Sequence, residues 1–133
     1  MQFTNTEQEV ATIINGVIAA DSKDWMTYKL EKIIQENSAK DLYLTYSLAA
    51  TKVQSKKTIE FKEEAGALHA YLKTQDAQFL QLVRIYLLIR VLNANEAYFA
   101  PKVANLIQVA DTSELATFLK FLILLPNLSL IHI

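Results

Sequence analysis

The chain of 133 residues suits one domain with one core, and thirteen basic residues nearly balance fourteen acidic ones to a net charge of -1. This balance excludes the broad positive field of a nucleic acid-binding protein, and the lack of cysteine excludes disulfides and thiolate chemistry. Only two glycines and two prolines occur, too few for the turns of an all-β fold or for a phosphate-binding loop. The composition therefore predicts an all-α protein.

The first helix is expected to begin at Thr4 or Thr6, because a glutamate follows each threonine at the spacing of a capping box. Its apolar stripe keeps a helical spacing across Asn15-Gly16, so we expect the helix to continue through this dipeptide. The same dipeptide between apolar residues is also a strong hairpin signal. The stripe consists of Val10, Ile13, Ile14, Val17 and Ile18.

Two more helices are predicted over residues 23–35 and 41–53, the first of them capped by Asp21 and Ser22. The second segment is ambiguous, because its apolar residues alternate as in a strand and also repeat as in a helix. Its alanines and the lack of a partner strand favour a helix. The inward residues of the first helix are expected to be Trp25, Met26, Leu30, Ile33 and Ile34.

A polar loop over residues 54–58 precedes a fourth predicted helix over residues 60–72, with Phe61, Ala65, Leu68 and Leu72 on its apolar face. The run over residues 77–92 is apolar on nearly every side, so it must be buried. Its two arginines argue against a membrane span, which needs about 20 apolar residues. We expect this run to be the central helix, capped by Thr74 and Asp76 and closed by residues 93–95.

A sixth helix is expected to have Pro101 in its first turn, where the missing N–H is harmless. Asp111 and Glu114 have the capping-box spacing for a seventh helix over residues 114–125. Apolar helices centred near Tyr46, Tyr86 and Phe121 recur after 40 and then 35 residues. This period predicts antiparallel helix pairs, about seven helices in all, and is similar to stacked HEAT or armadillo repeats. We expect one domain over residues 1–127 and an apolar tail over residues 128–133.

The start of the chain places two glutamates where a signal peptide needs an apolar core, and no basic residue precedes Lys23. We therefore expect a cytoplasmic protein. No metal site is expected, because His69 and His132 are the only imidazoles and neither has acidic residues at ligand spacing. His69 is interpreted as a surface or boundary residue, and the lysines of residues 52–62 as a solvated loop offset by nearby glutamates.

The two arginines are the best candidate site residues, because both lie in the most apolar segment of a chain with eleven lysines. Arg90 suits the last turn of a helix, where a cation interacts favourably with the helix dipole. Arg84, in mid-helix, is interpreted either as a partly buried ion pair or as an anchor for an acidic ligand or partner. With Tyr46 and Tyr86, the two arginines make up the candidate ligand- or partner-binding set.

Self-association is predicted for the carboxy end. We expect one face of the seventh helix to pack on the sixth helix through Leu119, Leu122, Ile123 and Leu125. The apolar residues that remain would then face outward, and large exposed apolar patches usually mark contact sites. A two-fold homodimer is the expected form, since that symmetry is the commonest. The residues assigned to this contact are Phe118, Phe121, Leu124 and Leu128.

Three stretches of the chain carry a family resemblance. The first is Trp25 with LEKI (residues 30–33) and LYLTYSL (42–48), and the second is RIYLLI (84–89). The third and most specific is ADTSELATFLKFLILLPN, residues 110–127. Together they resemble the bacterial EboA proteins, a family of metabolite traffic proteins. The resemblance corresponds to the N-terminal portion of a family member, since LSLIHI stands where the family continues into a further helical region. We interpret residues 128–133 as a truncation or an altered reading frame.

The resemblance implies a non-enzymatic binding or scaffold protein, from gene clusters implicated in moving a secondary-metabolite precursor across the inner membrane. Its partner would be a metabolite or a protein of the same cluster, and no catalytic residue or cofactor is carried over from the family. Two alternatives stay open: a generic helical-repeat module for protein contacts, and an enzyme of unrecognised type.

Overall fold

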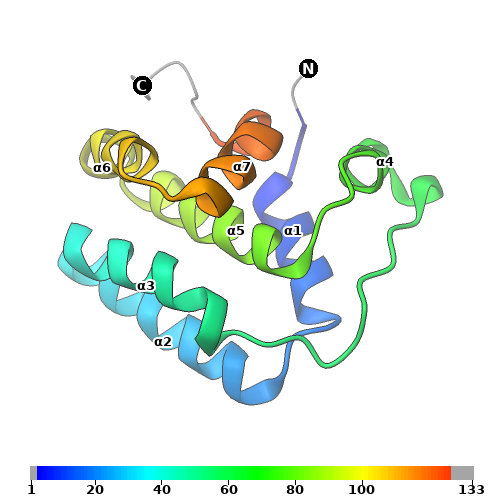
Figure 1. Ribbon diagram of the computed structural model, residues 1–133, viewed down its shortest axis with the longest axis horizontal. Helices are drawn as coiled ribbons and strands as arrows, with labels where there is room; N and C mark the ends of the chain where they lie inside the picture. The colour runs from blue at the N-terminus through cyan, green and yellow to red at the C-terminus, as the bar shows by residue number, and fades with distance from the viewer. Residues whose placement is uncertain (1–2, 127–133) are drawn as a thin grey trace.

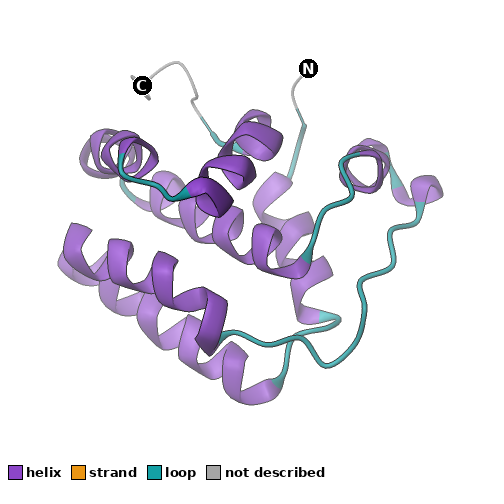
Figure 2. Cartoon of the chain, viewed as in Figure 1, coloured by secondary structure: helices purple, strands orange, loops and turns teal. Residues whose placement is uncertain are grey.

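The computed structural model describes residues 3–126, in which seven α-helices and two short 3-10 helices occur and no strand does (Figures 1 and 2). The all-α fold and the number of helices are as the sequence predicts. No helix within these residues is long and apolar enough to cross a bilayer. The α-helices are α1 (Thr6–Asn15), α2 (Ala20–Glu36), α3 (Ala39–Lys52), α4 (Ala67–Thr74), α5 (Phe79–Ala94), α6 (Glu96–Gln108) and α7 (Thr112–Phe121), and the 3-10 helices are η1 (Glu63–Ala65) and η2 (Leu122–Leu124).

Helix α5 is the centre of the fold, and the prediction of a central helix here is confirmed. It packs against α1, α2, α3, α6 and α7 (Figure 1). Every residue from Leu82 to Ile89 is buried, because neighbouring helices cover the apolar side chains on all sides. Each such leucine or isoleucine contributes about 1.5 to 3 kcal/mol through burial. The helix begins at a capping box formed by Gln78 and Gln81, rather than at Thr74 or Asp76 as expected.

Helices α2 and α3 lie side by side as an antiparallel pair (Figure 1). The turn between them uses Asn37 in the left-handed conformation (φ 49°) and Ser38, whose hydroxyl accepts a hydrogen bond from the backbone N–H of Asp41 at 3.1 Å. The helical repeat of α3 thus prevails over its strand-like alternation. The expected cap of α2 is wrong, because α2 already begins at Ala20. Ser22 bonds elsewhere: its hydroxyl accepts from the backbone N–H of Gln54 at 2.8 Å.

Helix α1 ends at Asn15, so the expected continuation through Gly16 is wrong, and the dipeptide forms no hairpin either. The chain leaves the helix because the next residues bond to a distant segment. The N–H of Ala19 donates to the carbonyl oxygen of Gln54 at 2.9 Å, and the N–H of Lys56 donates to that of Val17 at 2.7 Å. These two hydrogen bonds form an isolated antiparallel bridge between Ile18 and Ser55, which fixes the segment after α3 against the end of α1.

Helix α4 starts at Ala67, later than expected, after an extended segment and the short turn η1. Gly66 explains the late start, because its backbone (φ 136°, ψ 178°) lies in a region that only glycine readily adopts. Leu68 and Leu72 are buried as predicted. The hydroxyl of Tyr71 donates to the backbone carbonyl oxygen of Lys120 at 2.8 Å, which ties α4 to the end of α7.

Helix α6 follows α5 after Asn95 alone, whose side chain accepts a hydrogen bond from the N–H of Tyr98 and so caps α6. Pro101 is the sixth residue of α6 and lies inside the helix, not in its first turn as expected. The early start displaces the proline, because Asn95 serves as the cap. Figure 1 shows α6 almost along its axis while α5 runs across the view, so these two helices cross steeply.

Candidate functional site

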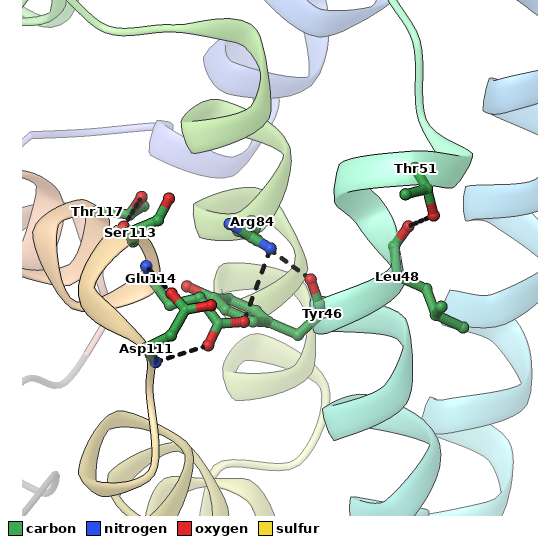
Figure 3. A network of polar contacts seen from close by, with 8 residues as sticks. All are labelled: Tyr46, Leu48, Thr51, Arg84, Asp111, Ser113, Glu114 and Thr117. Carbon is green, nitrogen blue, oxygen red and sulfur yellow. Dashed lines mark hydrogen bonds and ion pairs between the residues drawn. The ribbon is translucent and has the colours of Figure 1, made fainter.

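Arg84 extends from the middle of α5 toward α3 and α7 (Figure 3). Its Nε donates a hydrogen bond to the backbone carbonyl oxygen of Tyr46 at 3.1 Å, and its Nη2 lies 3.7 Å from a carboxylate oxygen of Glu114. The guanidinium also lies over the Tyr46 ring, 5.1 Å from its centroid. Only 5% of the Arg84 side chain and 10% of the Glu114 side chain are exposed, so water screens this pair weakly. Arg84 therefore joins three helices.

Glu114 uses both of its carboxylate oxygens. Oε2 faces Arg84, while Oε1 accepts a hydrogen bond from the backbone N–H of Asp111 at 3.0 Å. In return, Oδ1 of Asp111 accepts from the N–H of Glu114 at 2.8 Å, which completes the predicted capping box of α7. The same residue thus starts α7 and holds it on α5. The geometry of Arg84 is that of an ion pair between helices, and its guanidinium lies away from the surface.

Tyr46 belongs to the core. Its ring stacks on that of Phe118, with centroids 5.6 Å apart and planes 3° from parallel. Burial raises the pKa of the Tyr46 hydroxyl well above its usual range, an effect that Arg84 opposes and that Glu114 and Asp111 reinforce. The hydroxyl oxygen is buried and has no hydrogen-bond partner among residues 3–126. Tyr46 therefore remains neutral, and its ring packs against α7 through Phe118.

Arg90 and Tyr86 lie together one turn apart on another side of α5. Nη1 of Arg90 donates to the Tyr86 hydroxyl at 3.1 Å, and Nε lies 3.9 Å from a carboxylate oxygen of Glu7 on α1. The structure thus divides the predicted set into two places: Arg84 with Tyr46 between α5, α3 and α7, and the partly exposed Arg90 with the buried Tyr86 on the side of α5 that faces α1.

A cleft of about 210 Å³ opens beside Arg90 and Tyr86, between α1, α2 and α5, and we call it the Arg90 cleft. Its cations are Arg90 and Lys23, and Glu31 is an acidic residue on its wall. Sequence analysis missed Lys23 as a site residue, because nothing in the sequence places the start of α2 beside the end of α5. The apolar part of the lining is Ala11, Ile14, Met26 and Leu30, and Asn15 and Thr27 complete it.

The residues assigned to self-association are not where we expected them. Phe118, Phe121 and Leu124 are buried in the chain's own core, whereas 73% of Leu119 is exposed. The expectation is wrong for Leu119, whereas Leu125 is buried as expected. The residues assigned to the outer face are covered because α7 packs on α5 as well as on α6. Leu128, the tail and His132 lie outside the described residues.

No group of three or more His, Asp or Glu side chains that could hold a metal ion occurs within residues 3–126. The family model described as "Metabolite traffic protein EboA" matches residues 6–131. The chain belongs to the EboA family. The match to EboA includes residues 128–131, where we expected the family pattern to stop. No curated protein and no solved structure matches this EboA-family chain.

Proposed function

We propose that this EboA-family protein binds a small molecule without converting it, and that the Arg90 cleft receives the molecule's acidic end. The observation that carries this proposal is the arrangement of Arg90, Lys23 and the Tyr86 hydroxyl around an apolar lining. A guanidinium recognises a carboxylate through two parallel hydrogen bonds, and the apolar lining suits a ring or short chain. Clefts for whole drug-sized ligands measure about 300 to 1,000 Å³, so this smaller cleft suits one end of a larger metabolite.

Arg90 is available for such a contact, unlike Arg84. Its ion pair with Glu7 spans 3.9 Å, and the two side chains are 34% and 40% exposed. Exposed pairs of this kind are worth about 0 to 1 kcal/mol, so a ligand carboxylate can replace Glu7 at little cost. The Tyr86 hydroxyl meanwhile holds the guanidinium in place. These contacts support binding rather than catalysis, in keeping with the family's description as metabolite traffic proteins.

The test is a titration of the ¹⁵N-labelled protein with benzoate, a minimal ring with a carboxylate, followed by NMR. The amides of Asn15 and Thr27, which line the cleft, should shift and saturate. Arg90→Gln should weaken binding about tenfold, since a charge-assisted hydrogen bond is worth about 1.5 to 3 kcal/mol. Lys40→Gln, an exposed change on α3 away from the cleft, serves as the control. Equal affinity of the parent and Arg90→Gln would refute the proposed site.

Native mass spectrometry extends this test to natural ligands. A small molecule that co-purifies with the parent protein should be depleted from Arg90→Gln and retained by Lys40→Gln. Retention by both variants would place the bound molecule elsewhere.

A second candidate function is binding of a protein partner, as a scaffold. Leu115 and Leu119 favour it, because they are one turn apart on the outer side of α7 and both are exposed. Leu119→Ser should then abolish co-elution with a protein of the same gene cluster, while Arg90→Gln should leave co-elution intact. Unchanged co-elution of Leu119→Ser would refute this second function and leave the small-molecule function alone.

A further inference from the structure

A larger cleft, of about 500 Å³, lies on another side of α1, between its end, residues 57–62 and α4. We call it the His69 cleft. Its volume falls in the range of about 300 to 1,000 Å³ that is typical of small-molecule sites. None of its lining residues belongs to the Arg90 cleft. The lining consists of Thr12, Ile13, Gly16, Val17, Lys57, Thr58, Ile59, Glu60, Lys62 and His69.

The wall of this cleft is fixed at both ends. At one end, the backbone hydrogen bonds of Val17 and Ala19 hold the segment after α3 against the end of α1. At the other end, the ring of Phe61 packs edge-on against the ring of His69, with centroids 6.4 Å apart. Residues 57–62 are therefore held across the gap between α1 and α4. The cleft is a consequence of the fold and not of one side-chain position.

The chemistry of the lining is amphipathic. Ile13, Val17 and Ile59 provide apolar surface, while Lys57 and Lys62 provide two cations against a single acid, Glu60. Neither lysine has an ion-pair partner within residues 3–126. Long cationic side chains without partners beside apolar surface are complementary to an anion with an apolar body.

His69 adds an unused polar group. Its Nδ1 is buried and has no hydrogen-bond partner among the described residues. Leaving a buried nitrogen unpaired costs about 1 to 3 kcal/mol, and few such groups occur in folded proteins. The imidazole lines both the His69 cleft and a smaller neighbouring hollow at the start of α1.

We propose that the His69 cleft binds an amphipathic organic anion. The apolar ring or chain of the ligand lies against Ile13, Val17 and Ile59, and its acidic group lies at Lys57 and Lys62. This inference does not rest on the function proposed for the Arg90 cleft. Because the two clefts share no residue, either site can fail its test alone.

The test compares two probes with the same aromatic frame, the anionic dye 8-anilinonaphthalene-1-sulfonate and its uncharged relative N-phenyl-1-naphthylamine, which lacks the sulfonate. The anionic dye should bind saturably and more tightly than the neutral one. The double variant Lys57→Gln, Lys62→Gln should bind the anionic dye about tenfold or more weakly than the parent does, and should bind the neutral dye with unchanged affinity. Lys40→Gln with Lys120→Gln, which removes the same charge from exposed positions outside the cleft, is the matched control.

The position of the dye is read from the glycine amides, because the chain has only two glycines. Gly16 lines the cleft and Gly66 does not, so the NMR signal of Gly16 should shift with the anionic dye while that of Gly66 shifts less. An unmoved Gly16 signal at saturation would place the dye elsewhere and overturn the proposal. Equal binding of the anionic dye by the Lys57/Lys62 variant and the parent would overturn it as well.

Discussion

Replacing Glu114 by glutamine should show how much the buried ion pair contributes to stability. The change keeps the size of the side chain and an oxygen that can accept the hydrogen bond from the N–H of Asp111. It removes the charge that faces Nη2 of Arg84 at 3.7 Å. At that distance the Coulomb energy is about 4 kcal/mol with an effective dielectric constant of about 20. The backbone oxygen and ring of Tyr46 still stabilise Arg84, so we expect a net loss of about 3 kcal/mol, near the lower end of the range for broken buried pairs.

The assay is urea unfolding followed by circular dichroism, with the free energy of unfolding extrapolated to water. Asp111→Asn is the matched control, because it makes the same acid-to-amide change one turn away at an exposed position, and asparagine caps helices as well as aspartate. It should cost less than about 0.5 kcal/mol. Arg84→Met combined with Glu114→Gln should recover most of the stability lost by Glu114→Gln, since no charge is then buried alone. A loss for Glu114→Gln no larger than that for Asp111→Asn would refute the reasoning.

Three further outcomes are expected. Leu88→Ala should cost about 2 to 5 kcal/mol in urea unfolding, because Leu88 is fully buried at the centre of α5; a small loss would contradict the central position of the helix. Gly66→Ala should cost about 1 to 3 kcal/mol despite the free space around Gly66, because its φ of 136° disfavours any side chain. Tyr46→Phe should keep the stacking on Phe118 and leave stability at pH 7 unchanged or higher, because the lost hydroxyl has no hydrogen-bond partner within residues 3–126. Since folding raises the pKa of Tyr46, the neutral form stabilises the fold fully below the unfolded-state pKa of about 10, and this contribution is lost as pH rises above it. Urea midpoints between about pH 9 and about pH 11 should therefore fall more steeply for the parent than for Tyr46→Phe.

The fold was predictable where a local pattern is strong enough by itself. Helix α5 is apolar on all sides and had to be central, and the capping box of Asp111 and Glu114 fixed the start of α7. The starts of other helices, such as α2, depend on distant residues. Ser22 stands at a position typical of a helix cap, but its hydroxyl bonds to the backbone of residues 52 and 54, about thirty positions away. Local sequence rules cannot predict such a distant partner.

The faces of α7 were predictable in principle and were assigned wrongly. Within α7, the buried residues Glu114, Thr117, Phe118 and Phe121 follow the spacing of a single helical stripe. Two of them are polar, so a search for apolar residues alone placed Leu119 inward and Phe118 and Phe121 outward. Arg84 offered the signal that could have corrected this assignment, because a mid-helix cation in the core needs a carboxylate on a facing helix. Glu114 is that carboxylate.

The division of the predicted binding set into two places follows from helix geometry. Arg84 and Arg90 are six residues apart, and at about 100° per residue their side chains leave α5 in directions about 120° apart, about 9 Å along its axis. They cannot converge on one ligand. Tyr86 precedes Arg90 by one turn and meets it, whereas Tyr46 reaches Arg84 from another helix. The two arginines therefore have different roles. Arg84 is enclosed by α3 and α7 and holds these helices on α5. Arg90 lies beside a cleft and is only weakly paired, so it is the arginine that the proposed ligand would contact.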